Sequence, residues 1–249
     1  MDAVYTIWLR NVKRYLRSRS RIVGSLGMPL FFLVILGFGL NSVVTDSHMR
    51  GGYVGFIVPG IVAMSVLFTA VFSGIQIIWD KQFGFLKETL VAPVSRLSIM
   101  LGQTFGGATT ALIQGFIILV LSLFLGLKVP GAAGFLVALG FMILIGVAFT
   151  AFGIAIASRM EDMHGFQLIM NFVIFPIFGL SGALFPIDRL PLWLRSLTYA
   201  DPLTYGVEGI RYGLSGTATI PPLASLGALA AFAVAMVGIG AWLFRNVRS

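Results

Sequence analysis

Six long apolar runs dominate this sequence of 249 residues and restrict what it can fold into. They cover residues 22–40, 53–78, 98–126, 134–157, 166–185 and 223–244. A helix needs about 20 apolar residues to cross a lipid bilayer. The chain is 58% hydrophobic and only 10% charged, whereas soluble domains carry about 25% charged residues. We therefore expect an all-α polytopic membrane protein, with residues 1–249 forming a single transmembrane domain of six helices.

Two local features modify these spans. In the third run, Gly102 and Gly106 form a Gly-x-x-x-Gly motif, which predicts that another helix approaches closely there. In the fifth run, Pro176 is expected to interrupt the helix, because proline lacks a backbone N–H and clashes with the preceding turn.

A basic segment, residues 1–21, precedes the first run. Among its arginines and its lysine, Trp8, Val12, Tyr15 and Leu16 fall on one face of a helix. This pattern is typical of an amphipathic helix in the headgroup region of a membrane. A cleavable signal peptide is the alternative, but its apolar core is usually about 7–15 residues long. Because residues 22–40 are long enough to span, we expect an interfacial helix over residues 1–21.

The lysines and arginines are distributed unevenly between the two sides of the predicted bundle. If the N-terminus is cytoplasmic, twelve of them lie on the cytoplasmic side and five on the outer side. Because cytoplasmic segments carry the excess of basic residues, we expect both termini in the cytoplasm. This asymmetry accounts for the net charge of +8 without nucleic acid as a partner.

Residues 78–96 connect the second and third runs and mix charged with large apolar side chains. The apolar residues fall at positions 83, 86, 90 and 91, which is close to helical spacing. Pro93 ends any helix there. The pattern favours a short amphipathic helix over residues 80–95 that docks onto a partner at the membrane surface. A solvated loop between two spans is the alternative, and the pattern alone leaves both open.

The connection formed by residues 186–222 is too apolar for an ordinary loop. It is also too broken to span, because Pro191, Pro202 and the glycines at 206, 209 and 213 interrupt it. We expect two short re-entrant helices that dip into the outer leaflet, where non-helical backbone needs cover from protein or water. Glu208 and Arg211 are three residues apart and can pair on one helix face, partly shielded from water. A cap without function is the alternative.

Several kinds of chemistry have no residue pattern to support them. None of the four lysines lies in a Gly-x-x-x-x-Gly-Lys-Ser/Thr phosphate-binding loop. The chain has no cysteine, and we expect His48 and His164 on opposite sides of the membrane, so no metal site is expected. Few ionisable groups lie in the spans, which disfavours a proton relay. The energy for any transport must therefore come from another chain.

One enzymatic alternative rests on two Gly-x-Ser-Gly motifs, which contain Ser181 and Ser215. They match the segment around the nucleophile of rhomboid-type intramembrane proteases. That chemistry needs a base to take the serine proton. In those proteases the base is a histidine on a later span, and this chain has no histidine after His164. Small residues for helix packing explain both motifs better.

Three groups of motifs together resemble one family. The first is FGFLKETLVAPVSR, residues 83–96; the second is LSGALFP, residues 180–186, followed by Leu-Pro and Trp-Leu; the third is DPLTY, residues 201–205, followed by Gly-Ile-Arg, residues 209–211. They resemble the membrane subunits of type-2 ATP-binding-cassette exporters, closest to the branches that export drugs, lipid-like molecules and nodulation factors. Asp201 departs from the commoner asparagine but keeps a side chain that can start a helix.

The resemblance implies a cell-membrane permease, not itself an enzyme, that works as a homodimer with two ATPase subunits carrying Mg-ATP. It implies that the coupling helix contacts the ATPase through Lys81, Phe83, Phe85, Leu86, Lys87, Glu88, Leu90 and Val91. The pathway between two permeases would include Met64, Phe68, Phe72, Asn171, Phe175 and Phe178, and an external gate would include Trp193, Tyr205, Glu208 and Arg211. Such an aromatic and Met-containing wall suits an amphiphilic cargo, whether drug, lipid or glycolipid-like. The alternatives are export of a polysaccharide or teichoic-acid-type polymer, and a membrane scaffold without transport.

Overall fold

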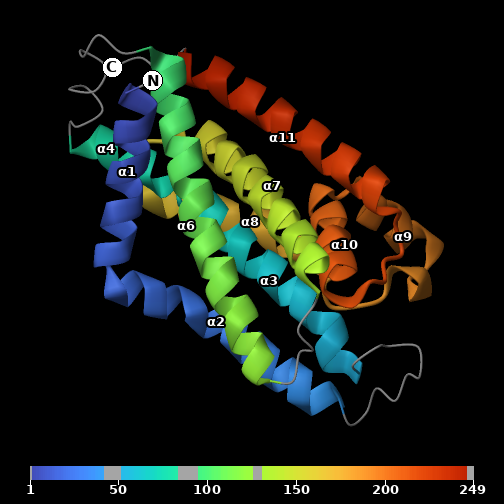
Figure 1. Cartoon of the computed structure of the whole chain (residues 1–249). Helices are drawn as coiled ribbons and strands as arrows, with labels where there is room; N and C mark the ends of the chain where they lie inside the picture. Colours follow the sequence, from blue (N-terminus) through green and yellow to red (C-terminus); the bar gives the residue numbers. More distant parts are fainter. Residues whose placement is uncertain (1, 42–51, 84–94, 126–130, 246–249) are drawn as a thin grey trace.

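The computed structural model describes residues 2–41, 52–83, 95–125 and 131–245, and the regular elements within these ranges are all helical (Figure 1). The helices are α1 (Asp2–Arg17), α2 (Arg19–Asn41), α3 (Gly52–Phe72), α4 (Ile75–Gln82), α6 (Arg96–Phe124), α7 (Ala132–Ala157), α8 (Met163–Leu180), η1 (Ile187–Arg189), α9 (Leu192–Ala200), α10 (Pro202–Ser215) and α11 (Pro222–Arg245).

Six segments of the described chain are long and apolar enough to cross a membrane, which confirms the number of spans predicted from the sequence. They are α2, α3 together with α4, α6, α7, α8 and α11. Figure 1 shows that α1 begins and α11 ends at the same end of the molecule, as an even number of crossings requires. The shorter helices α9 and α10 lie away from that end.

Helix α3 forms the centre of the bundle and packs against α2, α6, α7, α8 and α10. Its apolar side chains from Ile57 to Leu67 are nearly all fully buried. In contrast, α2, α8 and α11 expose many large apolar side chains, such as Phe31, Phe172 and Val234. In a membrane protein such faces meet lipid or another protein, because neither water nor this chain covers them.

Helix α1 packs along the first half of α6, and small residues on α6 allow the close approach. A Cβ atom added to Gly102 would lie 2.8 Å from the Cβ of Ile7, and one added to Gly106 would lie 2.7 Å from Nδ2 of Asn11. The predicted close packing at this Gly-x-x-x-Gly motif is confirmed, but the neighbour is α1 and not another span. The predicted interfacial location of α1 stays a prediction.

The prediction that Pro176 interrupts the fifth span was wrong, because Pro176 lies inside α8, which continues to Leu180. The two short helices predicted within residues 186–222 are present as α9 and α10. The glycines at 206, 209 and 213 lie inside one continuous helix, α10. They do not break it because each packs directly against α7. Gly206 packs against the side chain of Ile145, Gly209 against the ring of Phe141 and Gly213 against the backbone of α7, and none of the three leaves room for a Cβ atom. The second run, in contrast, divides at Ser73 and Gly74 into α3 and α4.

Candidate functional site

A pocket with a volume of about 460 Å³ lies among α1, α2, α3, α4 and α6. Its apolar wall includes Met28 from α2 and Met64, Phe68 and Phe72 from α3. Its polar wall includes the side chains of Asn11, Ser65, Thr69, Gln76, Gln103 and Thr110. The pocket is therefore amphipathic, and it is formed within a single chain.

Two arginines, Arg14 on α1 and Arg21 on α2, line the same pocket, and both are exposed. The guanidinium of Arg14 lies 6.0 Å from the ring centroid of Trp79, another lining residue. Neither arginine pairs with a carboxylate among the described residues. The pocket thus carries positive charge that no acidic group in this part of the chain offsets.

A polar cluster around Asp80 fixes the walls of the pocket. Asp80 is 5% exposed, and its Oδ2 accepts from Nη2 of Arg10 at 2.9 Å. Its Oδ1 accepts from Nε2 of Gln76 at 2.9 Å, and Oδ2 also accepts from Nε2 of Gln103 at 3.4 Å. Asn11 Nδ2 then donates to Oε1 of Gln103 at 2.6 Å. These bonds join α1, α4 and α6, so that one buried carboxylate is satisfied from three elements.

The residues predicted to line a pathway on the second and fifth spans meet along an aromatic seam between α3 and α8. The rings of Phe68 and Phe175 lie edge to face with centroids 5.6 Å apart, and those of Phe72 and Phe166 lie 6.4 Å apart. Phe178 contacts Phe32 of α2 in the same way at 6.2 Å. Of the other two predicted residues, Met64 is buried and Asn171 is half-buried. Only Met64, Phe68 and Phe72 of this set line the pocket.

The predicted external pair, Glu208 and Arg211, lies at the centre of a buried network. The Glu208 side chain is 0% exposed and that of Arg211 is 7% exposed, so the expectation of partial shielding was wrong. Arg211 Nη1 donates to Glu208, and Nη2 donates to the carbonyl oxygen of Gly182 at 2.8 Å. The second oxygen of Glu208 accepts from the backbone N–H groups of Thr219 and Ile220.

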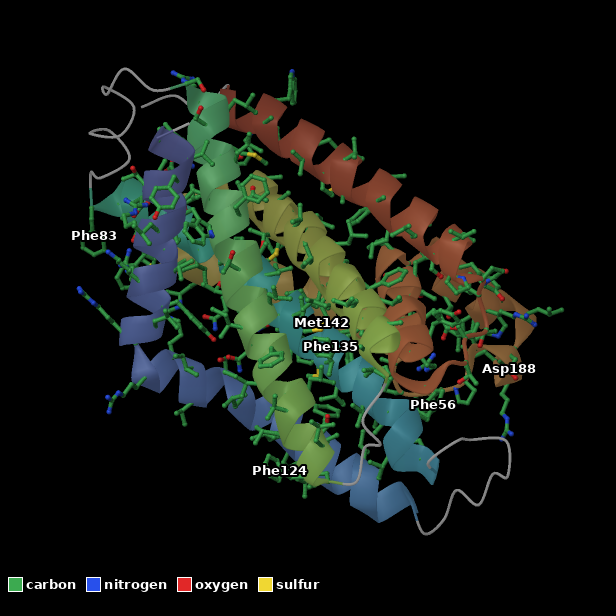
Figure 2. All side chains as sticks on the ribbon, viewed as in Figure 1. Phe56, Phe83, Phe124, Phe135, Met142 and Asp188 are labelled. Carbon is green, nitrogen blue, oxygen red and sulfur yellow. The ribbon has the colours of Figure 1, made fainter. Side chains whose placement is uncertain are left out.

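This network connects α10 with the end of α8 and with the chain entering α11. The Arg211 guanidinium also lies 4.3 Å from the ring centroid of Phe56 on α3, a cation–π contact (Figure 2 labels Phe56). Gly182 adopts a φ of +69°, a conformation that favours glycine, and this turn presents its carbonyl to Arg211. Of the other predicted gate residues, Trp193 is exposed on α9, and the hydroxyl of Tyr205 donates to the carbonyl of Tyr199.

Residues 2–215 match the family model described as the ABC-2 type transporter. The chain belongs to the ABC-2 type transporter family. The inner membrane transport permease YadH of Escherichia coli K12 is 29% identical over 236 residues, which cover 94% of this chain and 91% of YadH. Nodulation protein J of Rhizobium leguminosarum bv. trifolii is 30% identical over 232 residues, which cover 92% of this chain and 87% of that protein. The resemblance expected from the sequence motifs is thereby confirmed.

In this ABC-2 permease, the predicted coupling helix falls mostly outside the described residues. Phe85, Leu86, Lys87, Glu88, Leu90 and Val91 all lie in that part, so their role stays a prediction. Phe83, the last residue described before it, is 63% exposed and contacts the Trp79 ring at a centroid distance of 5.5 Å. In Figure 2, Phe83 lies at the edge of the bundle, far from Phe124, which is the last residue of α6.

Lys81 has partners within this ABC-2 permease. Its Nζ donates to the carbonyl oxygens of Ser158 at 2.6 Å and Met160 at 3.2 Å, at the C-terminus of α7. Gln82 Nε2 donates to the carbonyl oxygen of Glu161 at 2.8 Å. Basic side chains stabilise a helix C-terminus because its last carbonyls lack intrahelical partners. Lys81 therefore fastens α4 to the segment between α7 and α8, and its proposed contact with an ATPase stays a prediction.

Within the described ranges, no group of three His, Cys, Asp or Glu side chains is placed to hold a metal ion. Arg14, Arg21 and Ser65 line the pocket but are not among the site residues predicted from the sequence. For the two arginines the sequence indicates only a charged helix face, because their approach to α3 depends on how α1 turns into α2. The i, i+4 spacing of Gln76 and Asp80 was a usable signal for the polar cluster.

Proposed function

We propose that this permease is the membrane-spanning subunit of an ATP-driven exporter that moves an amphiphilic molecule outward. The observation that carries this proposal is the pocket, which combines Met64, Phe68 and Phe72 with a polar, basic wall inside a transport-permease family. Pockets that bind small molecules are mostly apolar, with a few polar groups that fix orientation. Drug, lipid and glycolipid-like cargos all have this division.

The energy for export comes, in this proposal, from ATP hydrolysis on a separate subunit. Membership of the ABC-2 family implies an ATP-binding-cassette ATPase as partner. We propose two copies of it, each with Mg-ATP, which contact the permease through residues 80–95. The permease itself carries no phosphate-binding loop in its sequence, and YadH is named a transport permease.

We further propose that two copies of the permease assemble side by side in the membrane. The exposed apolar faces of α2 and α8 support this arrangement, because they flank the aromatic seam and carry Phe31, Ile35, Leu168 and Phe172. The cargo would pass between the two copies, with lipid covering the remaining faces. In this proposal both termini are cytoplasmic, which the excess of lysine and arginine supports.

The test is to express the tagged permease in its source cells, identify an ATPase that co-purifies, and reconstitute the complex in liposomes. Amphiphiles should stimulate ATP hydrolysis and accumulate on the side of the liposome away from the ATPase. The same complex with a hydrolysis-deficient ATPase is the control. Stimulation of ATP hydrolysis by charged polysaccharides and not by amphiphiles would indicate export of a polymer instead. If no ATPase co-purifies, the permease would be a membrane scaffold without transport.

A further inference from the structure

The pocket described above holds more positive charge than the structure around it uses. Arg14 and Arg21 line it, and neither pairs with a carboxylate among the described residues. Asp80, the carboxylate of the polar cluster beside the pocket, is already paired with Arg10 and accepts hydrogen bonds from Gln76 and Gln103. A cationic ligand would therefore be repelled by Arg14 and Arg21, whereas an anionic group would form charge-assisted hydrogen bonds with them.

The apolar lining of the same pocket is unsuited to a bare anion. Met28, Met64, Phe68 and Phe72 form its apolar wall. At about 460 Å³ its volume lies in the usual range of small-molecule sites, roughly 300–1,000 Å³. An inorganic phosphate or chloride would leave this apolar surface uncovered, while an alkyl or prenyl chain would cover it. Thioether and aromatic side chains adapt readily to such flexible chains.

Two buried polar atoms of residues that line the pocket have no hydrogen-bond partner in the described structure. Ser65 is 1% exposed, lines the pocket, and its Oγ makes no hydrogen bond. Oδ1 of Asn11, another lining residue, is also buried without a partner. Because buried polar groups are nearly always hydrogen-bonded, these atoms indicate a ligand with a polar linker, such as a hydroxyl or ester, between its charged and apolar ends.

We propose that this pocket binds an anionic amphiphile, with its negative headgroup at Arg14 and Arg21, its polar linker near Ser65, and its apolar chain against Met64, Phe68 and Phe72. The residues that line the site all come from one chain. The inference names the class of cargo, and in that respect it rests on the proposed function. Binding itself requires neither ATP hydrolysis nor transport and can be measured alone.

The experiment uses the full-length permease, with its ATPase when one co-purifies, in phosphatidylcholine nanodiscs without ATP. Radiolabelled oleoyl lysophosphatidate is the probe, oleoyl monoacylglycerol is its uncharged counterpart, and empty nanodiscs correct for partitioning. The double variant R14Q/R21Q should weaken lysophosphatidate binding at least about ten-fold, since each arginine supplies a charge-assisted bond. It should leave monoacylglycerol binding unchanged. The variant R17Q/R19Q, which changes two nearby arginines that do not line the pocket, should affect neither probe.

A second pair of variants tests the apolar part. Gly24 lines the pocket, and a Cβ atom there would meet nothing within 4 Å, so Gly24→Leu adds bulk toward the pocket without a clash. It should weaken binding of both probes. Gly27 has equally open surroundings and does not line the pocket, so Gly27→Leu is the matched control. A diazirine near the end of the acyl chain should label Met64 or Phe68 on illumination.

Equal loss of lysophosphatidate binding in R14Q/R21Q and R17Q/R19Q would overturn the inference, because general surface charge would then explain the attraction. Competition by equimolar inorganic phosphate would also overturn it in favour of a simple anion site. If binding follows the expected pattern but no amphiphile is exported by the complete complex, the site stands and the proposed function fails. If export occurs while these variants bind normally, the cargo site lies elsewhere.

Discussion

The Glu208–Arg211 pair shows how burial changes what a single residue does. The spacing of the two residues predicts their contact, and the family resemblance implies a place in an external gate. In the structure both side chains are buried, and Arg211 also contacts Gly182 and Phe56. Removal of one member of a buried ion pair leaves the other charge without compensation. The pair therefore matters first for the stability of the fold at this end of the bundle.

We expect Glu208→Ala to destabilise the purified permease by about 3–5 kcal/mol. Thermal unfolding in detergent, followed by circular dichroism, measures the effect. The double variant E208L/R211M should recover much of the loss, because it removes both charges together. Arg195→Gln is the control, since among the described residues the half-exposed Arg195 side chain hydrogen-bonds to Tyr199 of the same helix. Unchanged thermal stability of Glu208→Ala would contradict the buried network.

Asp201 should make stability depend on pH. Its Oδ1 accepts from the Leu203 N–H and caps α10, whereas Oδ2 is buried without a partner. Burial raises the pKa of this carboxyl, which lies outside the six candidate spans, to about 7. Because the folded pKa exceeds the unfolded value, the folded state binds the extra proton. Its contribution to stability is therefore complete below pH 4 and lost as the pH rises to about 7 and above.

Asp201→Asn keeps the capping oxygen and removes the ionisation. We expect the unfolding temperature of this variant to exceed that of the natural protein by more at pH 8 than at pH 5, because the natural protein loses the contribution progressively between these pH values. Thermal scans at the two pH values check this. An identical pH dependence in both proteins would show that Asp201 is not the group responsible.

At the scale of elements, α10 was predicted as a short helix, but the packing role of its glycines was not. Glycines at 206, 209 and 213 resemble breaks, because glycine weakens a helix. Their spacing of three and four places them on one helix face, which is also the signature of close packing. The choice between the two readings depends on whether another helix lies there, and α7 is far away in the sequence. Gly102 and Gly106 on α6 also have this spacing, and close packing could be predicted for them because they lie within an expected span.

Gly213→Ala should destabilise the permease by about 1–3 kcal/mol, as overpacking does. The new Cβ would lie 2.6 Å from the Gly134 carbonyl oxygen and 2.7 Å from the Ala138 nitrogen, and backbone atoms cannot rotate away. Gly140 also lies in a helix, but a Cβ there meets nothing within 4 Å. Gly140→Ala should therefore stabilise by about 0.5–1 kcal/mol. Equal effects of the two changes on thermal unfolding would contradict the packing of α10 on α7.

The segment after α4 carries a prediction about the ATPase. Phe83 is exposed although it is large and apolar, and burial of such a side chain by a partner contributes about 1.5–3 kcal/mol. The double variant F83A/L86A should reduce recovery of the ATPase with the tagged permease, while membrane insertion stays normal. Phe124→Ala is the control variant, because Phe124, the last residue of α6, is also a large exposed apolar side chain (84% exposed) but lies outside residues 80–95. Full recovery of ATPase and transport with F83A/L86A would assign residues 80–95 to an ordinary loop.

At the scale of the whole molecule, the six spans were predictable because the length and hydropathy of each apolar run are enough to indicate a membrane-spanning helix. The pocket was not, since it depends on the turn between α1 and α2 and on the polar bonds that hold α1 against α6. Residues from four stretches of sequence meet there, and no local period records such a meeting. The family could be recognised from its motifs, but motifs at helix ends do not show which side chains face the same space.

The orientation of the molecule can be tested because the chain contains no cysteine. We expect a cysteine placed at Ser47 to react in intact cells with a thiol reagent that cannot cross membranes. A cysteine at Ser249 should react only after the cells are opened, because the excess of basic residues predicts that both termini are cytoplasmic. Labelling at Ser249 from outside would reverse the proposed topology.

The fastening of α4 to the far end of α7 has a mechanical consequence. Lys81 donates hydrogen bonds to the backbone carbonyls of residues 158 and 160, and Gln82 donates one to that of residue 161, shortly before α8 begins. We therefore expect a displacement of α4 to displace the start of α8 as well, while α4 also follows α3 along the chain. Because aromatic rings of α3 and α8 pack against each other, the two helices should then move as one unit with their ring contacts kept.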